Sequence, residues 1–358
     1  MTLPRIDDEG FLAVENDEQV PLKKSVDGLE NSVHVFAEAE VRAINAALAT
    51  GRALLVRGEP GTGKSQLARA AAIALGRSFV HQTVDSRTET RDLMWTLDAV
   101  ARLGQAQLLA AVHTLEHPSG STAAPEGRSV SKEDVAEHLA VERFIRPEAL
   151  WWALDPKSAA DQAREKGAGT CALITLPAEN ESVPDTVVLV DEIDKAEPSV
   201  PNGLLDALGQ GGFNVPGIGR VGRTADRPLV IITTNEERAL PDAFVRRCLV
   251  LHLTLPPDDD ALIAWLCERG DAHFKNRNGR KGLYEAAAKL LVEDRKAAKK
   301  LRLAPPGLAE YIDLLEAIVT RKSLLKEQLA LLEQVAEYVL CKHPELHKRK
   351  FPERYPEP

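Results

Sequence analysis

The chain has 358 residues, of which 44% are hydrophobic and 28% charged, a composition that fits a globular protein and excludes a largely disordered one. This length favours about two domains. The formal net charge of −9 excludes a general basic surface for non-specific nucleic-acid binding, so we expect no nucleic-acid partner unless a local basic patch supplies one. No apolar run is long enough to cross a membrane and the first ten residues contain no apolar signal core, so we expect a cytoplasmic protein.

The N-terminal part of the chain predicts an arm followed by the start of a parallel sheet. Residues 1–32 mix acids, proline and glycine without periodicity, so we expect an extended arm, with order beginning near Val33. Apolar residues at helical spacing then predict a helix over 38–50. Two apolar runs around an alanine-rich segment predict a strand, a helix and a second strand, at 53–56, 65–75 and 79–84.

An insertion interrupts this alternation at about 85–150. Residues 90–113 have helical character, whereas 118–131 are rich in Ser, Gly, Ala and Pro and predict a solvated loop. Three further β-branched runs suit the interior of a parallel sheet, at 186–190, 229–233 and 249–253. The expected fold class is therefore α/β, with five parallel strands flanked by helices.

The rest of the chain is helical in period. The double proline at 256–257 marks the change, so we expect an α/β core over 33–256 and an all-helical region over 257–358. The expected helices lie near 259–269, 284–300, 306–320 and 323–340.

One glycine-rich segment carries the strongest chemical signal. It reads Gly58-Glu59-Pro60-Gly61-Thr62-Gly63-Lys64-Ser65, fits GxxxxGK[ST], and stands between a predicted strand and a predicted helix that continues with Gln66. Backbone N–H groups of such a loop surround nucleotide phosphates, Lys64 reaches the β and γ phosphates, and the Ser65 hydroxyl binds magnesium. A chance match in a turn is the alternative, and it does not account for the flanking strand and helix.

Two later strands end in polar residues suited to the same chemistry. Asp191 and Glu192 follow an apolar strand, where Asp191 can hold magnesium through water and Glu192 can polarise an attacking water. Asn235 ends another buried strand, where its neutral amide can orient that water. Either feature alone also fits a solvated or capped turn.

These segments and their order resemble the AAA+ ATPases, and more narrowly the MoxR-like, dynein-related group of the helix-2-insert clade. The matching stretches are GEPGTGKS, VVLVDEIDKA and IITTNEERALPDAFVRRC, and the resemblance covers about 33–253 well and the helical remainder loosely. It implies a P-loop NTPase core with a helical lid, hydrolysis of ATP with Mg²⁺, and a homo-oligomeric ring, usually of six subunits. It also implies a chaperone-like action on a protein client, with a von Willebrand A-type protein as a frequent partner.

The resemblance assigns Walker A to Lys64 and Ser65, Walker B to Asp191 and Glu192, and sensor 1 to Asn235. Val245-Arg246-Arg247-Cys248 matches the arginine-finger box, with Arg247 the better aligned arginine. An arginine suits this role because its delocalised, permanent charge can reach the γ phosphate bound by a neighbouring subunit. The alternative for either arginine is an ion pair within its own subunit.

Three further features follow from this resemblance. Ser86 to Trp95 is similar to the clade's insert and 211–222 to the hairpin before sensor 1, although Met94 and Trp95 equally suit a packed core. The sensor 2 position departs from the pattern, because Pro306 stands where an arginine is expected and cannot ligate phosphate. Arg302 is a nearby substitute, or else an ordinary solvated residue.

The sequence thus favours an ATP-hydrolysing ring that remodels a partner protein. Two alternatives belong to other classes: a nucleotide-gated scaffold or signalling component with incidental turnover, and a DNA-associated AAA+ motor. The acidic net charge counts against the motor.

Overall fold

A mixed sheet forms the centre of the fold. The computed structural model describes residues 4–22, 32–116, 132–166, 172–173, 183–274, 281–322 and 324–345. Within them a six-stranded sheet has the order β12-β3-β11-β8-β4-β7, in which β7 pairs antiparallel with β4 and the other five strands are parallel. The predicted five-stranded parallel sheet is confirmed, and β7 is an addition at its edge. The bounds are β3 (Leu54–Gly58), β4 (Ser78–Thr83), β7 (Ala172–Leu173), β8 (Thr186–Asp191), β11 (Leu229–Thr234) and β12 (Leu249–Leu253).

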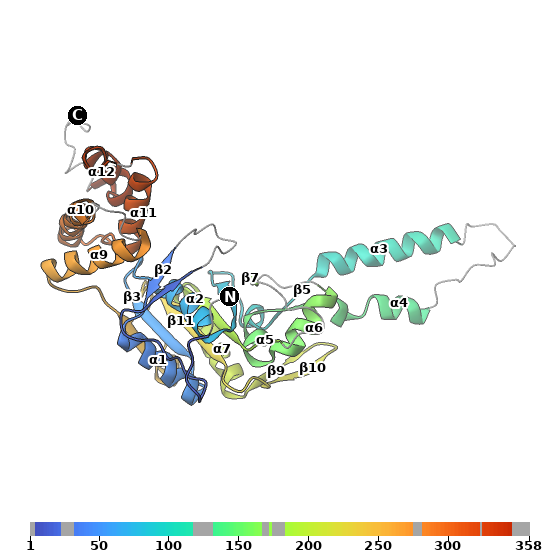
Figure 1. The fold of residues 1–358 in the computed structure, drawn as a ribbon. Coiled ribbons are helices and arrows are strands. Elements are labelled where there is room, and N and C mark those ends of the chain that lie inside the picture. The colour runs from blue at the N-terminus through green and yellow to red at the C-terminus, as the bar shows by residue number, and fades with distance from the viewer. Residues whose placement is uncertain are drawn as a thin grey trace.

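Helices cover both faces of this sheet (Figure 1). Successive residues of a strand point to opposite faces, so Leu54 and Leu55 enter two different apolar clusters. The cluster around Leu54 contains α1 and α2, and the cluster around Leu55 contains α5, α6, α7 and α8. Burial on both faces explains why these strands read as continuous apolar runs. The bounds are α1 (Glu38–Thr50), α2 (Lys64–Leu75), α5 (Ala149–Leu154), α6 (Pro156–Lys166), α7 (Ser199–Gly209) and α8 (Asp242–Arg247).

The N-terminal segment is ordered earlier than the sequence predicts. Strand β1 (Gln19–Pro21) pairs antiparallel with β2 (Val33–Val35), so regular structure precedes residue 33. Leu12 and Val20 are buried in the cluster that covers α2, and the Arg5 N–H donates to the Ala74 carbonyl at 2.6 Å. This segment is ordered by packing on α2. Its sequence has no periodicity from which that order could be predicted.

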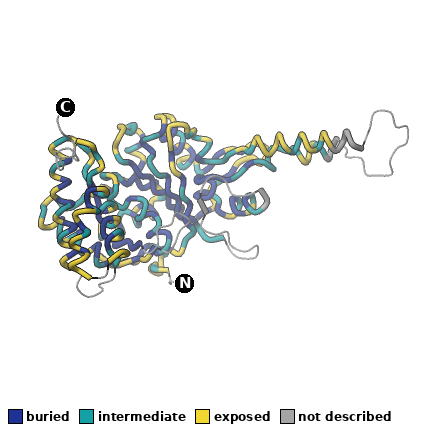
Figure 2. Tube along the Cα trace, turned by 90° about the horizontal axis from the view of Figure 1, so that it is seen from above, coloured by how far each residue is buried: buried dark blue, intermediate teal, exposed yellow. Residues whose placement is uncertain are grey.

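The insertion forms an arm that extends away from the sheet (Figures 1 and 2). Its base is a two-stranded antiparallel pairing of β5 (Trp95–Leu97) with β6 (Ile145–Pro147). The expected helix over 90–113 is therefore wrong in its first part, because Trp95–Leu97 takes an extended conformation to pair with a segment about 50 residues away. The remaining elements of the arm are η1 (Thr90–Leu93), α3 (Ala99–Glu116), α4 (Lys132–His138) and η2 (Val141–Phe144). The predicted loop at 118–131 lies outside the described residues.

A short helix and a hairpin complete the core. The 3₁₀ turn η3 (Ile193–Lys195) follows β8 directly. Strands β9 (Gly212–Val215) and β10 (Gly219–Gly222) pair antiparallel, as the segment 211–222 predicts.

The C-terminal helices form a bundle with its own apolar cluster, which includes Leu266, Leu291, Leu315 and Leu332. The bundle lies beside the carboxyl ends of the sheet strands (Figure 1). All four predicted helices are present, as α9 (Asp259–Phe274), α10 (Lys281–Lys300), α11 (Leu308–Val319) and α12 (Leu325–Leu340). Across the described residues, no helix is both long enough and apolar enough to cross a membrane.

Candidate functional site

The glycine-rich loop connects β3 to α2 in the conformation that its glycines permit. Gly61 and Gly63 have φ angles of +74° and +92°, in the left-handed region that glycine adopts most easily. A Cβ atom on Gly58 would lie 2.5 Å from the Leu253 carbonyl oxygen, so this position also admits only glycine. The loop therefore places its backbone at the N-terminus of α2, where helical N–H groups favour an anion.

Lys64 lies at the first turn of α2 and folds back over the loop. Its Nζ donates to the carbonyls of Gly58 at 2.8 Å and Glu59 at 2.9 Å. Burial lowers the pKa of this ammonium, while nearby acids, Asp191 first among them, act in the opposite direction. The charge is thus held inside the loop that would receive phosphates.

Asp191 is the centre of a polar cluster at the end of β8. The Ser65 hydroxyl donates to its Oδ2 at 2.9 Å, the Thr233 hydroxyl donates to its Oδ1, and His81 Nε2 lies 3.3 Å from Oδ2. Burial acts to raise the pKa of the Asp191 carboxyl, but hydrogen bonds from His81, Thr233 and Ser65 outweigh it, so the pKa lies below its usual value. Asp191 is therefore a fixed anion next to the loop.

The donor set around Ser65 fits magnesium. A serine hydroxyl and an ionised carboxylate are hard oxygen ligands, and Mg²⁺ takes one or two of these beside water and phosphate oxygens. Ser65 lies at the start of α2, just after β3, and Asp191 lies at the end of β8. Because β3 and β8 both pair in parallel with β11, their carboxyl ends lie at the same edge of the sheet. This is the arrangement predicted for Ser65 and Asp191.

Glu192 is turned toward the predicted sensor. Its φ of +62° is unusual for a residue with a side chain, and its N–H donates to the Thr233 hydroxyl at 3.0 Å. Its carboxylate accepts from Asn235 Nδ2 at 3.3 Å and from Lys195 Nζ at 2.6 Å. That hydrogen bond to Glu192 raises the pKa of Lys195. The structure thus brings Glu192 and Asn235 into contact, as expected for two groups that act on one water.

The two candidate arginines end α8 at the surface. Arg246 and Arg247 are both exposed, and Arg247 Nη1 lies 3.3 Å from Asp206 Oδ1. Both members of that pair are more than 60% exposed, so it is weak and leaves the guanidinium available. Arg52 anchors this end of α8: although its side chain is exposed, its guanidinium donates to the backbone carbonyls of residues 246, 247 and 248.

The remaining loop residues have supporting positions. The Thr62 hydroxyl donates to the Glu59 carbonyl at 2.9 Å, and Gln66 lies half-buried in the first turn of α2. Pro60 lies against the lid, because a Cβ atom on Gly307 would be 2.9 Å from its carbonyl oxygen.

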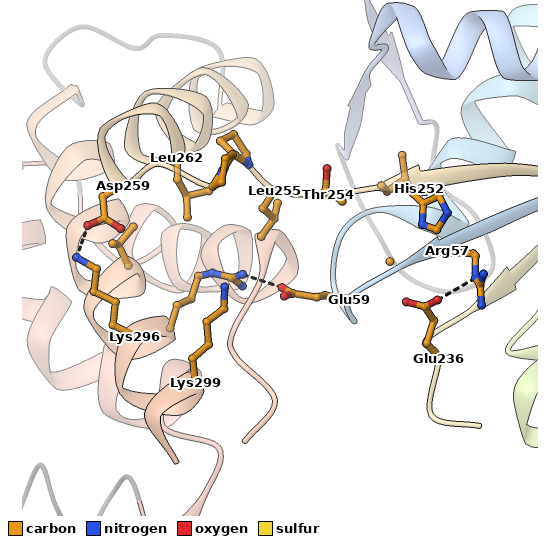
Figure 3. Close-up of a pocket in the computed structure, with 16 residues that line it drawn as sticks. Arg57, Glu59, Glu236, His252, Thr254, Leu255, Asp259, Leu262, Lys296 and Lys299 are labelled. Atoms are coloured by element: carbon orange, nitrogen blue, oxygen red, sulfur yellow. Dashed lines mark hydrogen bonds and ion pairs between the residues drawn. The ribbon is translucent and has the colours of Figure 1, made fainter. Parts of the chain in front are cut away.

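A cavity of about 300 Å³ lies beside the contact of the loop with the lid and is lined by residues of both (Figure 3). It is lined by the start of the loop, by the end of β12 and by α10, and its polar lining includes Glu59, Glu236 and Lys299. Arg302, for which the sequence left open a sensor 2 role or an ordinary solvated position, is exposed and has a φ of +57° in the turn after α10. A different lid arginine, Arg295, contacts the loop.

The side chains that position the predicted site residues were not identified from the sequence. His81, Thr233 and Lys195 each contact Asp191 or Glu192; Thr233 and Lys195 stand inside the matching stretches but were given no role, and His81 stands outside them. A signal for Thr233 exists, since it lies two residues before Asn235 on the same strand. His81 and Arg295 have no local sequence signal. Met94 and Trp95 are half-buried against the core that surrounds α5, which favours their alternative as packed residues.

The fold and this site define a P-loop nucleotide-binding protein. Residues 53–248, more than half of the chain, match the family described as AAA domain (dynein-related subfamily). The chain therefore belongs to this family and is an AAA+ ATPase by fold. No match to a curated protein was found.

Proposed function

We propose that the protein is a MoxR-type AAA+ ATPase that binds and hydrolyses ATP with Mg²⁺ in an oligomeric ring and remodels a protein client. The observation that carries the catalytic part is the contact of Glu192 with Asn235, beside an Asp191 carboxylate that the Ser65 hydroxyl already holds. These groups come from three chain segments that meet only in the fold.

The residues divide the chemistry between them. Lys64 and the loop N–H groups bind the phosphates, and Lys64 must exchange its two loop carbonyls for phosphate oxygens to do so. Glu192 accepts a proton from the attacking water, and Asn235 orients that water with its amide. Ser65 and Asp191 would hold Mg²⁺, which when bound supplies charge neutralisation at the phosphates.

Lys195 controls whether the Glu192 carboxylate is free to act as a base. Its ammonium lies 2.6 Å from Glu192 Oε2, so the carboxylate is paired where a general base must be free to accept a proton. Release of this pair accompanies activation of Glu192.

A ring is supported by the position of the arginines. Arg247 is 61% exposed at the end of α8, and Arg52 holds the backbone of that end in place. An exposed, positioned guanidinium suits a role in the site of a neighbouring subunit. Arg246, also exposed, is the second candidate for this role.

A client is supported by the projecting arm. Helix α3 carries large exposed apolar side chains, including Val100, Leu103 and Leu108, well away from the sheet (Figure 2). Exposed apolar groups on an extended element are typical of surfaces that bind another protein. A von Willebrand A-type partner is proposed on the family resemblance alone.

Variants of the two central groups test this function. Glu192→Gln should bind ATP with unchanged affinity while its steady-state phosphate release falls about a hundredfold or more, because it loses the general base. Asn202→Ala, on the exposed side of α7, is the matched control and should keep wild-type turnover. Turnover in Glu192→Gln at the wild-type rate would favour the scaffold alternative, and turnover that depends on added DNA would favour the motor.

A further inference from the structure

The lid touches the phosphate-binding loop directly, at the start of α11. The Ala309 N–H donates to the Gly61 carbonyl at 3.1 Å, and a Cβ atom on Gly307 would lie 2.9 Å from the Pro60 carbonyl oxygen. Glu310 caps this helix by accepting from the Gly307 N–H at 2.8 Å. The loop and the first turn of α11 are therefore in close backbone contact.

A single lid arginine extends this contact to the loop's side chains. Arg295 of α10 donates through Nη2 to Glu59 Oε2 at 2.7 Å and through Nη1 to the Pro306 carbonyl. Its side chain is only 6% exposed, whereas that of Glu59 is 42% exposed. Figure 3 shows the Glu59 carboxylate directed at α10. One guanidinium thus joins α10, the segment that leads into α11, and the loop.

Glu59 is tied to Lys64 as well as to the lid. Its carbonyl oxygen accepts from Lys64 Nζ at 2.9 Å and from the Thr62 hydroxyl at 2.9 Å, while its carboxylate holds Arg295. Lys64 must break its hydrogen bond to the Glu59 carbonyl to reach a phosphate. Phosphate binding therefore changes the hydrogen bonds of Glu59, the same residue whose carboxylate binds Arg295 of the lid.

Lys296 and Lys299 of α10 line the same cavity as Arg295, and Lys296 pairs with Asp259. Lys289 of the same helix pairs with Glu285 at 2.6 Å and is not among the residues that line the cavity.

We propose that Arg295, held by Glu59, is the positioning residue that couples the lid to nucleotide at the phosphate-binding loop. This role rests on the proposed function, since it presumes that the loop binds ATP. It provides a lid contact with the loop in a chain that has Pro306 where the resemblance expects an arginine. Arg295 acts through Glu59, and no contact with nucleotide is required of it.

A double-mutant cycle tests this coupling. The proteins are wild type, Arg295→Gln, Glu59→Gln and the double variant, with Arg295→Lys as the conservative variant and Lys289→Gln as the matched control on the same helix. The readouts are the dissociation constant of a fluorescent ATP analogue, KM and kcat for ATP, and amide hydrogen exchange of α11 with and without that analogue.

We expect Arg295→Gln to weaken nucleotide binding and raise KM about tenfold with a smaller change in kcat, and to abolish the slowing of exchange in α11 on nucleotide binding. Arg295→Lys should recover part of this response, and Glu59→Gln should add little to Arg295→Gln because the pair is already broken. Lys289→Gln should behave as wild type.

Several results would overturn the proposal. Additive effects of the two substitutions would do so, as would a wild-type exchange response in Arg295→Gln. If Arg295→Gln fails to fold, the half-exposed Glu59→Gln breaks the same pair and decides alone. Wild-type protein that binds no nucleotide overturns the proposed function together with this coupling, whereas normal wild-type binding with unaffected variants overturns the coupling alone.

Discussion

At the residue scale, the site depends on side chains that bond two partners at once. The Thr233 hydroxyl accepts from the Glu192 N–H and donates to the Asp191 carboxylate, so one buried group fixes both acids. Such a group is costly to lose, because the half-buried Glu192 N–H loses its acceptor and the Asp191 carboxylate loses one of its donors.

Thr233→Val should therefore lower the free energy of unfolding by about 1 to 3 kcal/mol and weaken magnesium-dependent nucleotide binding. Thr234→Val is the matched control, since Thr234 is also buried but its hydroxyl accepts from the Glu236 N–H instead of joining the two acids. Urea denaturation and a magnesium titration of ATP binding measure the two effects. Equal magnesium dependence in both variants would show that Thr233 does not position Asp191.

A half-buried histidine, His273, predicts a pH dependence of the free energy of unfolding. Burial lowers the pKa of His273 below 6.5, and the nearby Arg269 and His34 add to this, while its hydrogen bond to the Arg269 carbonyl opposes it. Below pH 6.5 the imidazole is therefore protonated more readily in the unfolded chain than in the folded chain. The contribution of neutral His273 to the free energy of unfolding is fully present above about pH 6.5 and is lost as pH falls from there toward the folded pKa.

His273→Gln should reduce this loss by about 1 kcal/mol between pH 7.5 and pH 5.5, relative to wild type. The exposed His138→Gln serves as the control and should retain the wild-type pH profile. Chemical denaturation at the two pH values measures the difference. An identical slope in wild type and His273→Gln would exclude His273 as its source.

At the element scale, the sequence predicted the elements whose signal is local. The strands of the core are short apolar runs, and α1 and α2 each end at a glycine with a left-handed φ, so both kinds of element show in a window of a few residues. Contacts between residues far apart in the sequence leave no local pattern from which they could be predicted. Strand β5 lies inside a segment of helical character, and Arg295 reaches Glu59 from 236 positions away.

The contact between α11 and the loop predicts the effect of a single methyl group. Gly307 has a φ of −120°, so alanine there brings no backbone strain and acts only by its Cβ against the Pro60 carbonyl. Gly307→Ala should push the lid from the loop and weaken ATP binding several-fold in equilibrium titrations. Gly104→Ala in α3 has open space around its Cβ and should bind ATP as wild type does. Unchanged ATP binding in Gly307→Ala would show that the contact between α11 and the loop does not influence the site.

At the scale of the whole molecule, two of three parts meet at the site. The sheet supplies the phosphate-binding loop and the acids, the helical lid contacts the loop, and the arm extends away from both (Figure 1). The α/β core and helical C-terminal region could be predicted because composition and period change together near residue 256. The base of the arm could not, since it depends on the pairing of β5 with β6.

A mixing experiment tests whether Arg247 acts between subunits. Glu192→Gln and Arg247→Ala should each lack turnover alone, and a mixture that exchanges subunits should regain about a quarter of wild-type turnover, because random neighbours combine an intact Glu192 with an intact Arg247 at that frequency. Phosphate release at equal mixing ratios measures this recovery. A mixture with exchanged subunits and no recovery would show that Arg247 serves its own subunit.

The central claim is that the loop at Lys64 binds ATP for hydrolysis. Phosphate release with Mg²⁺ from purified wild-type protein and from Lys64→Ala, compared side by side, tests it most directly. We predict turnover in the wild type and none above background in the variant, because the variant loses the cation that reaches the phosphates. Equal phosphate release from the two proteins would contradict the claim.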